Sequence, residues 1–185
     1  MTHSIVHSGD VGLAVRVDGE AGKPWLLVSN SLGADMGMWD GQIDFLTRTH
    51  RVLRYDTRGH GGSEAPPPPY NFDMLVADMI AILDHFEVEQ TDVMGLSLGG
   101  MTALGLGLDH PQRVGRMIVC DARADAPAPF VQSWDQRIAA INEGGMEAVV
   151  AGTLERWFTP SCPQEVIDKA AAMIRETSPD GYIGC

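Results

Sequence analysis

The 185-residue sequence is poor in cysteine, in positive charge and in long apolar runs. Its three cysteines, Cys120, Cys162 and Cys185, lie far apart with no CxxC pair, which gives no zinc site and favours free thiols in a reducing cytoplasm. Thirteen Lys and Arg against 25 Asp and Glu give a formal net charge of −12, which argues against nucleic acid or an anionic membrane surface as a partner. No apolar stretch reaches the roughly 18 residues that a membrane-spanning helix needs.

Short apolar runs alternate with helical patterns over the first 120 residues. The predicted strands span 13–17, 25–28, 51–55, 91–94 and 117–120, and the predicted helices span 38–46, 71–86 and 97–109. Such alternation predicts an α/β fold with a mostly parallel sheet and flanking helices. The strand at 13–17 is expected at an edge of that sheet.

The pattern changes at Arg123. A linker rich in Ala and Pro is followed by three predicted helices, 130–142, 146–158 and 163–177, with no strand between them. We therefore expect two parts, a core over residues 1–122 and a partial helical cap over residues 123–185.

One motif points directly to chemistry. Residues 95–100 read Gly-Leu-Ser-Leu-Gly-Gly, which fits G-x-S-x-G between a predicted strand and a predicted helix. In that context the pattern predicts a nucleophile elbow, a tight turn that exposes Ser97 at the carboxyl edge of the sheet. The following helix directs free N–H groups at the same point, so the backbone N–H of Leu98 is a candidate oxyanion donor.

A second oxyanion donor is expected in the loop after the strand at 25–28. That loop reads Ser-Asn-Ser-Leu-Gly-Ala-Asp over residues 29–35, and its glycine permits a close backbone turn. We expect the N–H of Leu32 to be the donor. The alternative is an ordinary polar turn.

With these motifs the sequence resembles the α/β-hydrolases, and among them the 3-oxoadipate enol-lactonases. The matching segments are SNSLGADMGMWDGQ, VLRYDTRGHGGSEAPPPPY, GLSLGGMTALGLGLDHPQRVGRMIVCD and ERWFTP followed by DGYIGC. The resemblance covers nearly the whole chain. SNSLG is its most diagnostic piece, because the serine elbow is shared by many hydrolases.

The resemblance implies a serine hydrolase that opens a small lactone in aromatic catabolism, 3-oxoadipate enol-lactone to 3-oxoadipate, through an acyl-enzyme on Ser97. It implies no cofactor and no metal, since a base and oxyanion donors activate the serine. The partner is a small lactone or ester substrate in the cytoplasm. The oligomeric state stays open, a homo-oligomer included. Asn30, Ser31 and Trp134 are candidate substrate-binding residues.

The sequence departs from the pattern of the family because it lacks the histidine that acts as the base of the triad. In this fold the triad runs Ser, then Asp or Glu, then His, and none of the six histidines follows the cap segment. We expect a chain that lacks the carboxyl-terminal strands, with the acid and the histidine beyond its last residue. Asp121 is a candidate for the catalytic acid, and the alternative is that it is a loop or capping residue. His60 is expected to be a hydrogen-bonded loop residue.

Two other functions stay open at this point. One is a carboxylesterase or cofactor-free perhydrolase on the same scaffold, and the other is a catalytically inactive binding module. An anionic substrate would need a local cation, for which Arg123 and Arg137 are the candidates.

Overall fold

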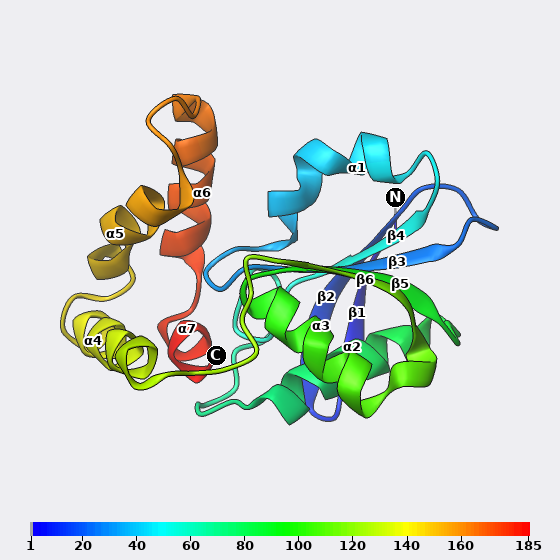
Figure 1. Ribbon diagram of the computed structural model, residues 1–185, viewed down its shortest axis with the longest axis horizontal. Helices are drawn as coiled ribbons and strands as arrows, with labels where there is room; N and C mark the ends of the chain where they lie inside the picture. The colour runs from blue at the N-terminus through cyan, green and yellow to red at the C-terminus, as the bar shows by residue number, and fades with distance from the viewer. Residues whose placement is uncertain (1) are drawn as a thin grey trace.

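The computed structural model describes residues 2–185 and contains one six-stranded sheet in the order β1-β2-β4-β3-β5-β6 (Figure 1). The strands are β1 (Thr2–Ser8), β2 (Val11–Asp18), β3 (Trp25–Ser29), β4 (Arg51–Tyr55), β5 (Thr91–Leu96) and β6 (Val114–Cys120). β4, β3, β5 and β6 are parallel to one another, whereas β1 and β2 are antiparallel to their neighbours. The predicted mostly parallel sheet is confirmed.

The edge position expected for residues 13–17 is wrong. They lie in β2, which pairs with β4 on one side and with β1 on the other, so that β1 forms the edge. The hairpin between β1 and β2 turns at Gly9, whose φ of 59° suits a residue without a side chain. This opening strand has no helix after it, and the alternation of strands and helices gave no signal for it.

Helices cover both faces of the sheet. These are the 3-10 helix η1 (Met36–Trp39) with α1 (Asp40–Leu46) on one face and α2 (Phe72–His85) with α3 (Leu98–Asp109) on the other. Alternate residues of β3 show why: Leu27 joins the core under α2 and α3, whereas Leu26 and Val28 pack with Trp39 on the η1 side. A short 3-10 turn, η2 (Pro111–Arg113), leads from α3 to β6.

Four helices follow β6 with no further strand among the described residues: α4 (Ala128–Gly144), α5 (Glu147–Trp157), α6 (Gln164–Glu176) and α7 (Pro179–Gly184). They stand beside the carboxyl end of the sheet in Figure 1. Leu32 and Leu98 from the sheet side share a buried cluster with Ile141, Ile174 and Tyr182 from these helices. The helices therefore close over the edge where β5 ends, while the domain division at residue 122 stays a prediction.

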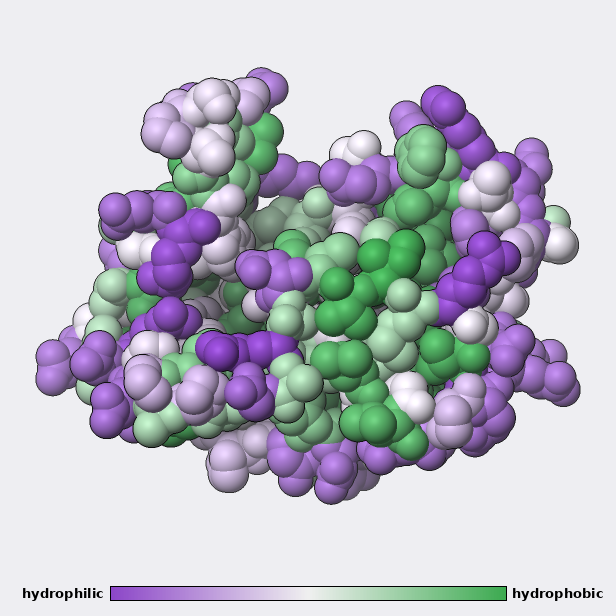
Figure 2. All heavy atoms as spheres, in the orientation of Figure 1, coloured by the Kyte–Doolittle hydropathy of each residue, from purple (hydrophilic) through white to green (hydrophobic). Residues whose placement is uncertain are grey.

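The face seen in Figure 2 has apolar surface over α3 and β6. Leu108, Ile118 and Val119 are among the exposed large apolar side chains of these two elements. No helix within residues 2–185 has the length and apolar character to cross a membrane.

Candidate active site

Ser97 occupies the sharp turn between β5 and α3, as the elbow motif predicts. Its backbone has φ 54° and ψ −114°, a strained conformation for a residue with a side chain. Its N–H donates to the carbonyl of Cys120 at 2.9 Å, and the N–H of Gly99 donates to the carbonyl of Asn30 at the same distance. A Cβ at Gly99 would lie less than 3.0 Å from the carbonyl group of Ser29, so only glycine fits there. Close backbone packing therefore imposes the strain at Ser97.

The loop after β3 is held against this turn by Asn30. Its side chain is fully buried, donates from Nδ2 to the carbonyl of Tyr55 at 2.8 Å and accepts at Oδ1 from Nε1 of Trp39 at 2.8 Å. Asn30 therefore lies outside the cavity next to Ser97, where it fixes the loop. Ser31, the other loop residue expected to bind substrate, does line the cavity.

Leu32 and Leu98 offer the N–H groups expected of an oxyanion hole. In the loop, the N–H of Ser31 approaches the sulfur of Met38 at 3.4 Å, that of Gly33 donates to His60 at 3.0 Å, and that of Ala34 donates to Ser31 at 3.1 Å. Within residues 2–185, neither the N–H of Leu32 nor that of Leu98 has an acceptor. Leu98 directly follows Ser97 and Leu32 lines the same cavity, so their role as oxyanion donors stays a prediction.

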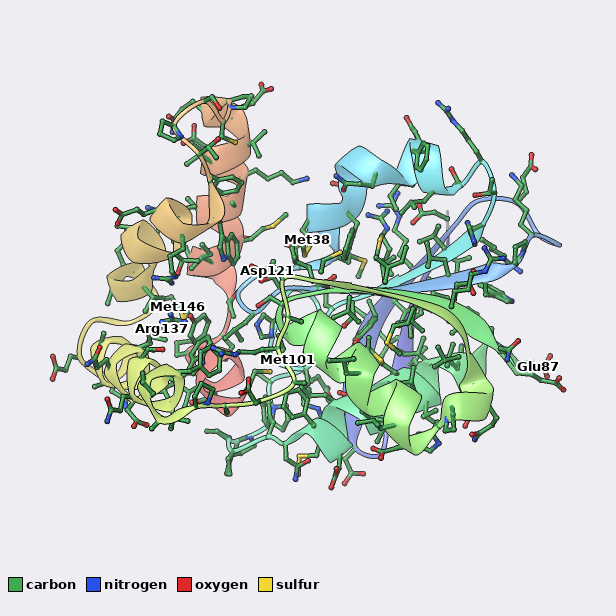
Figure 3. The ribbon with its side chains drawn as sticks, viewed as in Figure 1. Met38, Glu87, Met101, Asp121, Arg137 and Met146 are labelled. Atoms are coloured by element: carbon green, nitrogen blue, oxygen red, sulfur yellow. The ribbon has the colours of Figure 1, made fainter. Side chains whose placement is uncertain are left out.

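A cavity of about 450 Å³ opens beside Ser97, between the end of the sheet and the helices that follow β6. Its lining residues are Ser31, Leu32, Ser97, Met101, Asp121, Ala122, Arg123, Phe130, Trp134, Arg137, Thr153, Arg156, Trp157 and Tyr182. Figure 3 shows Arg137 projecting from α4 toward the sheet, on the side of Met101. The volume suits a small molecule rather than a polymer.

Three arginines line this cavity, and they differ in their partners. Arg123 lies 3.6 Å from a carboxylate oxygen of Asp125, whereas Arg137 stacks on Trp134, with 4.2 Å between its guanidinium carbon and the ring centroid. Burial raises the pKa of Tyr182, and the charges of Arg137 and Arg156 offset part of that rise. Arg123 and Arg137 were expected from the sequence, whereas Arg156 was not, because nothing in its local pattern shows that α5 turns this side chain into the cavity.

Asp121, the candidate acid, follows β6 directly and lines the cavity from the same sheet edge as Ser97. Its side chain is exposed and its φ is 43°. Its role as an acid stays a prediction, because an acid acts on serine through a histidine and no histidine lines the cavity within the described residues.

His60 is a buried loop residue, as expected. Its Nε2 accepts the N–H of Gly33 at 3.0 Å, and its Nδ1 lies 3.1 Å from the carbonyl of Arg58. Burial lowers its pKa to about 4, so the ring is neutral at pH 7. Both nitrogens are engaged, which leaves neither available as a base for Ser97.

The residues that hold metals in proteins do not gather here. Among residues 2–185, no three His, Cys, Asp or Glu side chains form a group that could hold a metal ion.

Comparisons with known proteins agree with this geometry. The model of the α/β-hydrolase fold family matches residues 24–166. A 3-oxoadipate enol-lactonase from Acinetobacter baylyi is 36% identical over 179 residues, which are 95% of this chain and 66% of the relative. The chain thus spans just under two thirds of the length of that relative.

Two solved structures resemble the chain closely. An enol-lactonase from Burkholderia xenovorans has a TM-score of 0.91 and 34% identity, over 99% of this chain and 71% of that one. A hydrolase from Pseudomonas aeruginosa has a TM-score of 0.91 and 39% identity, over 98% of this chain and 70% of that one. Together with the family match and the serine turn, these likenesses show that the chain belongs to the α/β-hydrolase fold family.

Proposed function

We propose that this protein is a serine hydrolase that opens a small lactone, with 3-oxoadipate enol-lactone as its substrate. The observation that supports it most is the strained turn at Ser97 beside a cavity that Leu32 also lines, with the N–H groups of Leu32 and Leu98 lacking acceptors within the described residues. The likeness to proteins named as enol-lactonases supports the choice of a lactone over other esters.

The proposed reaction begins when Oγ of Ser97 attacks the lactone carbonyl carbon. The N–H groups of Leu98 and Leu32 stabilise the negative charge that develops on the carbonyl oxygen. The ring C–O bond then breaks, and the enolate oxygen takes up a proton and rearranges to the ketone while the acyl group stays on Ser97. Water finally hydrolyses this ester and releases the open-chain acid.

A base must take the proton of Ser97, and the described residues place no histidine beside it. Imidazole added in solution can replace an absent histidine as a diffusible base. We therefore expect imidazole to accelerate acylation of Ser97 in the 185-residue chain. Deacylation also needs a base, so the acyl-enzyme should accumulate enough to be detected.

Intact-mass spectrometry tests this proposal. Ring opening releases no leaving group, so the adduct of a lactone has the full mass of that lactone. We expect one adduct after incubation with 3-oxoadipate enol-lactone and imidazole, mapped to Ser97 and absent from Ser97→Ala. An adduct of the same yield in Ser97→Ala, or none in the native chain, would contradict the proposal.

A second function is favoured by one observation, the lack of a histidine in the cavity among residues 2–185. It is a binding module that holds small acids or lactones without turning them over. Saturable binding of a lactone with no adduct at Ser97 in the presence of imidazole would favour this second function. Adducts from simple p-nitrophenyl esters at rates above those from the lactone would instead favour a carboxylesterase.

A further inference from the structure

The cavity beside Ser97 contains positive charge that the protein does not neutralise. Within the described residues, neither Arg137 on α4 nor Arg156 on α5 has a carboxylate oxygen within 4.0 Å. Arg123, in contrast, has Asp125 at 3.6 Å. The chain has a net charge of −12, so two arginines without a carboxylate partner in one cavity indicate a site for an anion.

Arg137 is held ready to bind a ligand. Its guanidinium lies over Trp134, and it is close enough to the phenol of Tyr182 for its charge to offset part of the rise in the pKa of Tyr182. Stacking uses the face of the guanidinium and leaves most of its in-plane N–H donors free for a planar anion. Phe130 lies edge-on to Trp134 with 5.8 Å between ring centroids and packs against that ring.

Arg156 is close enough to Arg137 for the two charges to repel. Burial and that repulsion lower the pKa of Arg156, and together they outweigh the attraction of Glu155. Its Nη2 donates to Oγ1 of Thr153 at 3.1 Å, which fixes the head group on the cavity wall. Two like charges held near each other bind an anion more strongly than either alone, because the anion relieves their repulsion.

We propose that Arg137 and Arg156 form a carboxylate subsite, so that the molecule bound at Ser97 is a lactone with an acidic side chain rather than a neutral ester. The inference rests on the proposed function for the identity of the reacting group. The ligand would place its carbonyl near Ser97 and Leu32 and its carboxylate at the two arginines, which line the same cavity from α4 and α5. A neutral ester of equal size would fit but would leave both cations unpaired.

Binding measurements test the subsite without any reaction step. The probes are adipate, a dicarboxylate, and dimethyl adipate, its neutral counterpart, each titrated while the fluorescence of the native chain is followed. Trp134 and Trp157 line the cavity and should report occupancy. We expect adipate to bind at least about tenfold more tightly than the diester, since a charge-assisted hydrogen bond contributes that much or more.

Substitutions then assign the effect to individual residues. Arg137→Met and Arg156→Met should each weaken adipate binding by about tenfold to 100-fold and leave diester binding almost unchanged. Arg137→Lys should recover only part of the loss, because lysine keeps the charge without the fork. Arg116→Met is the matched control, since Arg116 is exposed near the amino end of β6, away from Ser97. Thermal melting of each variant checks that it folds.

The outcomes test the carboxylate subsite and the hydrolase function separately. Equal affinity for adipate and its diester, or unchanged adipate affinity in both folded Met variants, would overturn the subsite. Tight adipate binding that depends on the arginines, with no lactone adduct on Ser97, would overturn the hydrolase and leave the subsite standing. Loss of adipate binding in Arg116→Met as well would show a nonspecific effect of charge and also overturn the subsite.

Discussion

Gly33 donates its N–H to Nε2 of His60 at 3.0 Å, which ties the loop after β3 to the loop after β4. The other ring nitrogen faces the carbonyl of Arg58, so His60 is neutral with its proton on Nδ1. Leu32 immediately precedes Gly33, and the bond therefore restrains the peptide next to the proposed oxyanion donor. In this arrangement His60 positions the loop that carries a donor, and it takes no proton from the serine.

Replacing His60 should reduce acylation of Ser97 without abolishing it. We expect His60→Ala to slow imidazole-assisted acylation by the lactone by about tenfold, because the Leu32 donor is misplaced rather than removed. His60→Gln, whose amide can accept from Gly33 and donate to Arg58, should retain most of the rate. Adipate affinity should change less than the acylation rate in both, because the arginines that hold one of its carboxylates do not contact His60. Acylation of His60→Ala at the native rate would show that the bond does not position Leu32.

His60 also predicts a pH dependence of stability. Burial lowers its pKa from 6.5 to about 4, so its contribution is complete above pH 6.5 and is lost as the pH falls toward 4. The loss amounts to about 3 kcal/mol in the free energy of unfolding. The measurement is urea unfolding at pH 7, 6, 5 and 4 for the native chain and His60→Gln.

Only the difference between these two proteins isolates His60. Burial raises the pKa of Asp56 to about 6, and this carboxyl changes stability in the opposite sense, with loss as the pH rises through 6. That contribution is common to both proteins and cancels in the difference. A difference that stays constant from pH 7 to pH 4 would show that His60 has an ordinary pKa.

Gly99 should be the least replaceable position of the elbow. A Cβ there would overlap the backbone of Ser29 and Asn30, which no rotamer change can relieve. We expect Gly99→Ala to lower the free energy of unfolding by about 3 kcal/mol and to prevent adduct formation at Ser97. The control is Gly41→Ala in α1, where a Cβ meets no atom within 4 Å and alanine is the better helix former. Native stability in Gly99→Ala would rule out the tight turn.

Local patterns predicted the sheet and the elbow because their physical causes are local. Apolar runs and their spacing predicted β3 to β6 and α2, and Asn71 caps α2 by accepting the N–H of Met74 at 2.9 Å. The G-x-S-x-G motif predicted the strained Ser97 because the glycines required for the turn are its neighbours in sequence. β1 and α7 were missed, since one opens the chain without a helix after it and the other is short and contains two glycines.

The cation pair of the cavity could not be predicted in this way. Arg137 and Arg156 lie on different helices, and only the packing of α4 against α5 brings them together. The sequence does show Trp134 and Arg137 three residues apart on one helical face, a spacing that favours their stacking. The position of Asn30 outside the cavity could not be predicted for a related reason: its partners, Trp39 and Tyr55, are set by tertiary structure.

Helix α7 is held next to the cavity by close backbone contact between two glycines, Gly59 and Gly181. Gly59, with φ 77°, lies against Gly181 of α7 so closely that a Cβ on either residue would come within 3.0 Å of the backbone of the other. This approach brings Tyr182, which is 4% exposed, under Trp134 with 6.3 Å between ring centroids. The loop after β4 therefore determines where Tyr182 lies relative to Arg137, which is close enough to influence its pKa.

Gly181→Ala should consequently separate α7 from the loop after β4 and disturb the anion subsite at a distance. We expect the free energy of unfolding to fall by about 1 to 3 kcal/mol and adipate affinity to fall by about tenfold, because Arg137 loses the fixed phenol that orients it. Gly41→Ala is again the control for adding one methyl group. Urea unfolding and fluorescence titration measure the two effects. If the variant lost stability but bound adipate as the native chain does, α7 would stabilise the fold without shaping the subsite.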